Sequence, residues 1–266
     1  MRALVISFAI ILLTVSICAA SQGLTIVAKV TRDDGTTTTT TNYIAEDHAR
    51  WSGGGDGDII LDAKAGEMIM LNNSKKTYSV ITKKDVDAMA AMIQERMNSP
   101  EMKRAQEAMK NLPPEQRQRI EAAMGSKTTM DVEKIGSTHT IAGYNCEDWT
   151  VSMGQASKTV QCVSTDVKFP PQAWAMFRDL SDSMKTLMAA MGPMKANTDT
   201  FIERMRKMKG IPLSSKTTIT VMGRTSVTST EVTDIKNGSI PDSAWQIPAG
   251  YTRVENPMAR ELAREK

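Results

Sequence analysis

The sequence predicts an α+β fold in which a strongly curved, half-barrel-like antiparallel sheet carries two helical insertions packed on one face. Short β-prone runs separated by turn residues fill the chain from Leu24 to Thr82. The apolar period then changes from two to about 3.6, the period of a helix. Strand-like runs return after this block and again after a second one, so strands and helices are segregated along the chain.

The N-terminal strands are expected to form a meander, because Gly, Asn and Asp residues typical of turns separate them. The expected strands are 24–31, 36–44, 49–52, 58–62, 67–71 and 76–81. The threonine run at 36–41 is interpreted as an edge strand, since threonine favours extended backbone.

The helical insertions are predicted over about residues 83–125 and 170–210. Thr82 and Asp85 have the spacing of a capping box at the start of the first insertion, with Asp in place of Glu. Methionine dominates both apolar stripes, and the chain has 20 methionines. Later strands are expected at 127–135, 145–153, 157–164, 215–222, 226–235 and 251–254.

The first 21 residues predict a signal peptide, because Arg2 is followed by an apolar run and then by the small residues of a cleavage site. We expect cleavage within Ala20-Ser21-Gln22, and export to the periplasm or the medium of a Gram-negative bacterium. A lipoprotein signal at Cys18 and an uncleaved membrane anchor remain as alternatives. Residues 22–256 then form a single α+β domain, and 257–266 form a C-terminal tail that could be helical.

Two cysteines, Cys146 and Cys162, remain after signal cleavage and are predicted to form a disulfide in an oxidising compartment. A hairpin turning at Gly154 would place them directly opposite each other. A redox or metal pair is the alternative, but the C-x-x-C spacing and the clustered histidines of such sites are absent from the sequence.

The charge balance and the histidines exclude several function classes. Thirty-three basic against 30 acidic residues give a net charge of +3, too small to indicate a nucleic-acid partner. The chain has two histidines, His48 and His139, and no Gly-x-Ser-x-Gly elbow. The sequence therefore predicts no catalytic residue, metal ligand or cofactor, and we expect a protein that is not an enzyme. A hydrolase with an unrecognised site is a distant alternative.

The methionine-rich stripes suggest a site for an apolar ligand, since methionine surfaces repack around varied partners. The candidate ligand-binding residues are Met89, Ile93, Met97, Phe177, Met184, Met188 and Met205. Ordinary core packing is the alternative interpretation of the same pattern. Cu(I) binding by thioethers is a more distant one, since the stripes include residues that cannot bind metal.

Four motifs resemble a family of secreted bacterial proteins catalogued as a domain of unknown function (DUF4412 type). They are 47–51 (DHARW), 112–116 (LPPEQ), 141–146 (IAGYNC) and 247–251 (IPAGY). More loosely, the alternation of strands and helices is similar to the periplasmic lipoprotein-carrier (LolA-like) superfamily. That likeness implies a half-open barrel that holds an apolar ligand under helical lids, without assigning a residue to it.

The expected function is therefore that of a non-enzymatic binder or carrier of an apolar envelope molecule such as a lipid. The alternative is an envelope scaffold or interaction protein without a small-molecule ligand. We expect no stable membrane span once the signal peptide is removed, and the sequence indicates no particular protein partner.

Overall fold

The computed structural model describes residues 21–53, 57–116, 130–154, 156–190, 201, 203–221, 223–256 and 260. The predicted signal peptide, apart from Ser21, and most of the predicted tail lie outside these residues. The strands are β1 Ser21–Arg32, β2 Thr37–Ala45, β3 His48–Ser52, β4 Gly57–Asp62, β5 Glu67–Asn72, β6 Thr77–Thr82, β7 Met130–Ile141, β8 Tyr144–Met153, β9 Ser157–Ser164, β10 Ile211–Val221, β11 Arg224–Ile240 and β12 Thr252–Arg253. The helices are α1 Lys83–Met97, α2 Pro100–Lys110, α4 Ala173–Ala190 and the short 3-10 helix η1 Asp242–Trp245.

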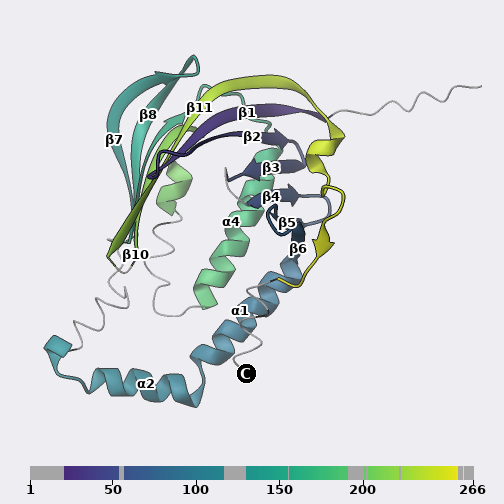
Figure 1. Ribbon diagram of the computed structural model, residues 1–266. Coiled ribbons are helices and arrows are strands. Elements are labelled where there is room, and N and C mark those ends of the chain that lie inside the picture. The colour runs from purple at the N-terminus through teal and green to yellow at the C-terminus, as the bar shows by residue number, and fades with distance from the viewer. Residues whose placement is uncertain are drawn as a thin grey trace, which may run out of the picture.

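The strands form one 12-stranded sheet in the order β12-β6-β5-β4-β3-β2-β1-β11-β10-β9-β8-β7. The sheet arches over α4 and is not closed into a barrel (Figure 1). All neighbouring strands pair antiparallel except β12, which pairs parallel with β6 at one edge. The large, mostly antiparallel sheet with helices is therefore confirmed.

β1 shows why alternation predicted these strands. Its side chains Leu24, Ile26, Ala28 and Val30 are buried, while the residues between them are more exposed, since successive side chains point to opposite faces. The edge position expected for the threonine run is wrong, because β2 lies between β1 and β3. Thr40 is buried there, with its hydroxyl 3.4 Å from the Ala28 carbonyl. The strand propensity of threonine does not indicate whether its strand has one neighbouring strand or two.

The first strand, β1, and the long eleventh strand, β11, lie next to each other in the middle of the sheet. β1 pairs with β11 from Ser21↔Ile240 to Arg32↔Thr228. β11 is 17 residues long and exceeds the predicted 226–235, because β1 on one side and β10 on the other satisfy its backbone groups.

The helices cover the concave face unevenly. Ala173 and Met176 of α4 are buried in the main core cluster with Leu24 and Leu213 of the sheet, and α1 packs against α4. The expectation that both insertions pack on one face fails for α2, which extends away from the sheet (Figure 1). Its described side chains are exposed or half-buried, which suits its many charges. No helix among the described residues is long and apolar enough to cross a membrane.

The predicted capping box at the start of α1 is present. The Asp85 amide donates to the Thr82 hydroxyl at 3.2 Å, and the Thr82 amide donates to the Asp85 carboxylate at 2.8 Å. Hydrogen bonds from the side chain and backbone of Thr82 lower the pKa of the Asp85 carboxyl. α1 therefore begins directly at the end of β6.

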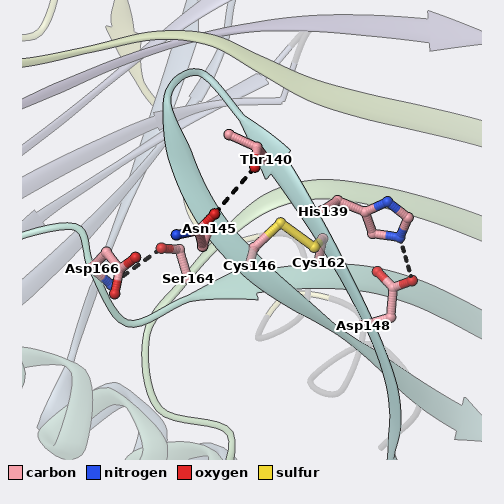
Figure 2. Close-up of a disulfide and its surroundings, with 8 residues drawn as sticks. All are labelled: His139, Thr140, Asn145, Cys146, Asp148, Cys162, Ser164 and Asp166. Carbon is pink, nitrogen blue, oxygen red and sulfur yellow. Dashed lines mark hydrogen bonds and ion pairs between the residues drawn. A yellow bond between two sulfur atoms is a disulfide. The ribbon is translucent and has the colours of Figure 1, made fainter.

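Cys146 of β8 and Cys162 of β9 form the predicted disulfide, with Cα atoms 5.3 Å apart (Figure 2). Both are buried in the main core cluster. Their expected position is wrong in one detail, because Cys162 lies opposite Asp148 and the cysteines are diagonal across the ladder. Met153 pairs with Ser157, so the hairpin is centred one residue beyond Gly154 and the register shifts by two.

Replacing both cysteines with alanine is expected to lower the free energy of unfolding by about 2 to 4 kcal/mol, because the disulfide restricts the unfolded chain. Urea denaturation checks this, and the reduced wild type is the control that should match the variant. Two readily alkylated thiols in native, oxidised protein would contradict the prediction.

Candidate functional site

Met89, the first of the predicted ligand-binding residues, is packed inside the protein. It is 2% exposed and forms a buried cluster with Ile81 of β6 and Val86 of α1. Its sulfur lies 3.7 Å from the side-chain amide nitrogen of Asn256. Met89 thus joins α1 to the sheet and to the C-terminal segment.

The other candidates are spread over three helical segments. Ile93 and Met97 are half-buried on α1, and Met205 is half-buried in the helical turn at 203–207. Phe177, Met184 and Met188 belong to α4, and their side chains lie outside the described part of the structure. The four candidates with described side chains line neither of the two cavities described next. The shared pocket for all seven stays a prediction.

The first cavity, which we call the acidic-rim cavity, has a volume of about 350 Å³ and lies between β4–β6, α1 and α4. Its apolar wall is formed by Leu61, Met68, Ile81, Val86, Met176 and Leu180. Its charged lining residues are Asp62, Glu67, Asp179, Asp182 and Lys83. Four carboxylates against one ammonium give its rim a negative character.

The second cavity, which we call the aromatic cavity, has a volume of about 280 Å³. Its wall includes Ile26, Ile44, Trp51, Ile211 and Val232 from five different strands, and Phe169 and Trp174 from the entry to α4. The described lining of this cavity contains no acidic or basic side chain. It can therefore accept an apolar group without leaving a charge desolvated.

Phe169 and Trp174 form the outer wall of the aromatic cavity. Their ring centroids are 4.6 Å apart with planes tilted by 40°, and Trp174 remains 40% exposed. Phe169 is half-buried against the main core cluster. Aromatic side chains beside a cavity are common in ligand sites, because they offer apolar area at little cost in side-chain entropy.

A third hollow, which we call the basic mouth, has a volume of about 380 Å³ and adjoins the aromatic cavity, because Phe169, Trp174, Gly210 and Ile211 line both. Gly210 has φ +120°, and a Cβ there would lie 2.2 Å from the Ser164 carbonyl oxygen. Only glycine allows this approach, so the segment entering β10 lies against the end of β9.

The only charged residues of the basic mouth among the described lining are Lys168 and Lys209. Both side chains are exposed. Lys168 directly precedes Phe169, and Lys209 directly precedes Gly210, so the backbone of each lysine lies beside a residue that also lines the aromatic cavity.

Both histidines lie beside carboxylates. His48 Nδ1 lies 2.7 Å from Asp47 Oδ1, and hydrogen bonds from Lys64 and His48 lower the pKa of Asp47. His139 Nε2 lies 2.8 Å from Asp148 Oδ2 beside the disulfide (Figure 2). In the described part of the chain, no group of three or more His, Cys, Asp or Glu side chains could hold a metal ion.

Two methionine sulfurs already contact amide groups, which bears on the Cu(I) alternative. Met89 lies beside Asn256, and Met208 Sδ accepts a hydrogen bond from Gln161 Nε2 at 2.9 Å. A metal at either sulfur would have to displace these contacts.

Sequence reasoning missed the aromatic cavity. The predicted binding residues did not include Trp51, Phe169, Trp174, Ile211 or Val232. The sequence signal that could have found this cavity is the placement of Phe169 and Trp174 on either side of two prolines, because a proline turn holds two large apolar side chains close together at the start of a helix.

Comparison with known families and curated proteins yields one family. Residues 84–251 match the model of the family described as Domain of unknown function (DUF4412). No curated protein matches the chain.

Similar solved structures are distant. PNGF-II is 12% identical with a TM-score of 0.40, and the match covers 92% of this chain and 33% of the PNGF-II chain. The MucA/MucB complex of Pseudomonas aeruginosa is 10% identical with a TM-score of 0.37, covering 87% and 56%. A LolA superfamily protein from Nitrosomonas europaea is 6% identical with a TM-score of 0.22, covering 86% and 91%. This chain thus spans a third to just over half of the first two, and with TM-scores below 0.5 none carries an argument about function.

Proposed function

This chain belongs to the family described as Domain of unknown function (DUF4412), and from that premise we propose that it is an exported, non-enzymatic binder or carrier of an apolar envelope molecule such as a lipid. The observation that carries the proposal is the aromatic cavity. Its wall is apolar or neutral throughout its described lining, and one side is formed by the partly exposed ring of Trp174. The Cys146–Cys162 disulfide supports an oxidising compartment.

The size and chemistry of the cavities suit part of an acyl chain. Cavities of about 300 Å³ and above, mostly apolar with a few polar groups, are typical of small-molecule sites. The aromatic cavity and the acidic-rim cavity are near this lower bound, at about 280 and 350 Å³. Each methylene buried there contributes roughly 0.8 kcal/mol before ordering costs are subtracted.

One observation favours the alternative of an envelope scaffold or interaction protein. Met89, which the carrier hypothesis placed in a ligand site, is part of a packed cluster with Ile81 and Val86. For this residue the ordinary-core interpretation of the methionine stripe accounts for its position without a ligand.

Trp174→Ala is expected to weaken binding of the uncharged fluorescent probe 1-N-phenylnaphthylamine by about tenfold, because it removes one wall of the aromatic cavity. Fluorescence titration of the purified protein measures this. The matched control is Ile219→Ala, since Ile219 is 43% exposed on β10 and lines none of the cavities named above. Unfolding midpoints should change little in both variants. A wild type that does not bind the probe would refute the carrier proposal and leave the scaffold alternative.

A further inference from the structure

The two cavities beside α4 differ in the sign of the charge at their openings. Asp62, Glu67, Asp179 and Asp182 border the acidic-rim cavity. The aromatic cavity has a neutral lining and opens beside the basic mouth, where the charged groups are ammonium groups. The two sites therefore present different electrostatic surfaces to the same ligand.

The lysines of the basic mouth are available to a ligand. Neither Lys168 nor Lys209 forms an ion pair with any residue that the structure describes, and both are exposed. Lys209 also borders a neighbouring polar hollow. The other charged residues lining that hollow are Lys134, Glu147, Asp166 and Lys207. Lys134 pairs with Glu147 at 2.7 Å, and Asp166 and Lys207 carry one charge of each sign, so these four residues add no net charge beside Lys209.

We propose that the preferred ligand of the aromatic cavity is an anionic amphiphile whose carboxylate or phosphate lies between Lys168 and Lys209, with its hydrocarbon chain against Trp51, Phe169 and Trp174. This inference rests on the proposed function and specifies its ligand class. The aromatic rings and the strand residues bury the chain, and the two ammonium groups make charge-assisted hydrogen bonds to the head group. Because the aromatic cavity and the basic mouth share a wall, one ligand molecule can occupy both.

The acidic-rim cavity does not suit the same ligand. A carboxylate or phosphate head at its opening would face four carboxylates, of which Asp182 is paired with Arg206 at 3.1 Å. Like charges disfavour binding there. Charge complementarity thus assigns the anionic ligand to the aromatic cavity.

The test compares cis-parinaric acid with its methyl ester at pH 8, where the acid is ionised and the hydrocarbon chains are identical. Wild-type protein should bind the acid about tenfold more tightly than the ester, as expected for a charge-assisted contact. In Lys168→Met/Lys209→Met this preference should be lost while ester binding is unchanged. Lys168→Arg/Lys209→Arg should retain the preference.

The control variant is Lys83→Met, which removes the single ammonium group lining the acidic-rim cavity in the described structure. It should leave the preference for the acid unchanged. Equal binding of acid and ester by the wild type overturns the inference about the head group but leaves the proposed function. Loss of the preference in Lys83→Met instead would place the ligand in the acidic-rim cavity, and this result would also overturn the inference about the head group. Absence of binding for both probes refutes the proposed function itself.

Discussion

Arg50→Leu is expected to lower the free energy of unfolding by about 3 to 5 kcal/mol, because it leaves a nearly buried carboxylate without its counter-ion. Arg50 NH2 and Nε donate to Asp58 Oδ2 at 2.6 and 3.2 Å, and the two side chains are 17% and 9% exposed. Arg50 NH1 also donates to the Ala244 carbonyl at 3.1 Å, which ties β3 to η1. In the variant, the side-chain contact to the Asp58 carboxylate that remains among the described residues is that of Asn73 Nδ2, at 3.4 Å.

Urea denaturation measures this loss, with the m-value as a check that the unfolded state is unchanged. The matched control is Lys236→Ala, which removes an exposed ion pair to Asp234 and should change stability far less than Arg50→Leu does. Arg50→Leu/Asp58→Leu should recover much of the loss, because the uncompensated charge is then gone. Equal effects of Arg50→Leu and Lys236→Ala would show that burial of the pair is unimportant.

Met89→Ala is expected to cost about 2 to 5 kcal/mol of stability, because a fully packed side chain leaves a cavity when it is shortened. Met89 is 2% exposed between α1 and β6. Met92→Ala, on the same helix, is the matched control, since Met92 is only half-buried at the edge of the same cluster. Its effect should be clearly smaller.

The same pair of variants tests the earlier interpretation of Met89 as a ligand contact. Because Met89 does not line the described part of either cavity, probe affinity per folded molecule should be unchanged in Met89→Ala. A stability loss near zero combined with weaker binding of 1-N-phenylnaphthylamine would restore Met89 to the ligand site.

Sequence alone identified the features that depend on neighbouring residues. The alternation of Leu24, Ile26 and Ala28 revealed a strand with one buried face, since side-chain direction in a strand repeats every two residues. Thr82 and Asp85 revealed the start of α1, because a capping box is complete within four residues. The disulfide pair followed from the two cysteines that remain when the predicted signal peptide is left out.

Other features were predictable only in part, because a local sequence pattern does not determine which strands or helices pack against an element. The threonine strand β2 was recognised, yet its neighbours on both sides were not. Likewise α2 has helical residues and a cap at Ser99, but nothing local indicates that it extends away from the sheet. The diagonal arrangement of Cys146 and Cys162 depended on a one-residue difference in the turn.

The tertiary structure alone determined the candidate site. Pairing of β1 with β11 joins the first strand to the eleventh and brings Ala28 opposite Val232, both of which line the aromatic cavity. Trp51 and Trp174 then line the same aromatic cavity, although they lie far apart in sequence. Hydrophobic periodicity specifies which side of a strand or helix is buried, but not which distant segment covers it, because burial is non-directional.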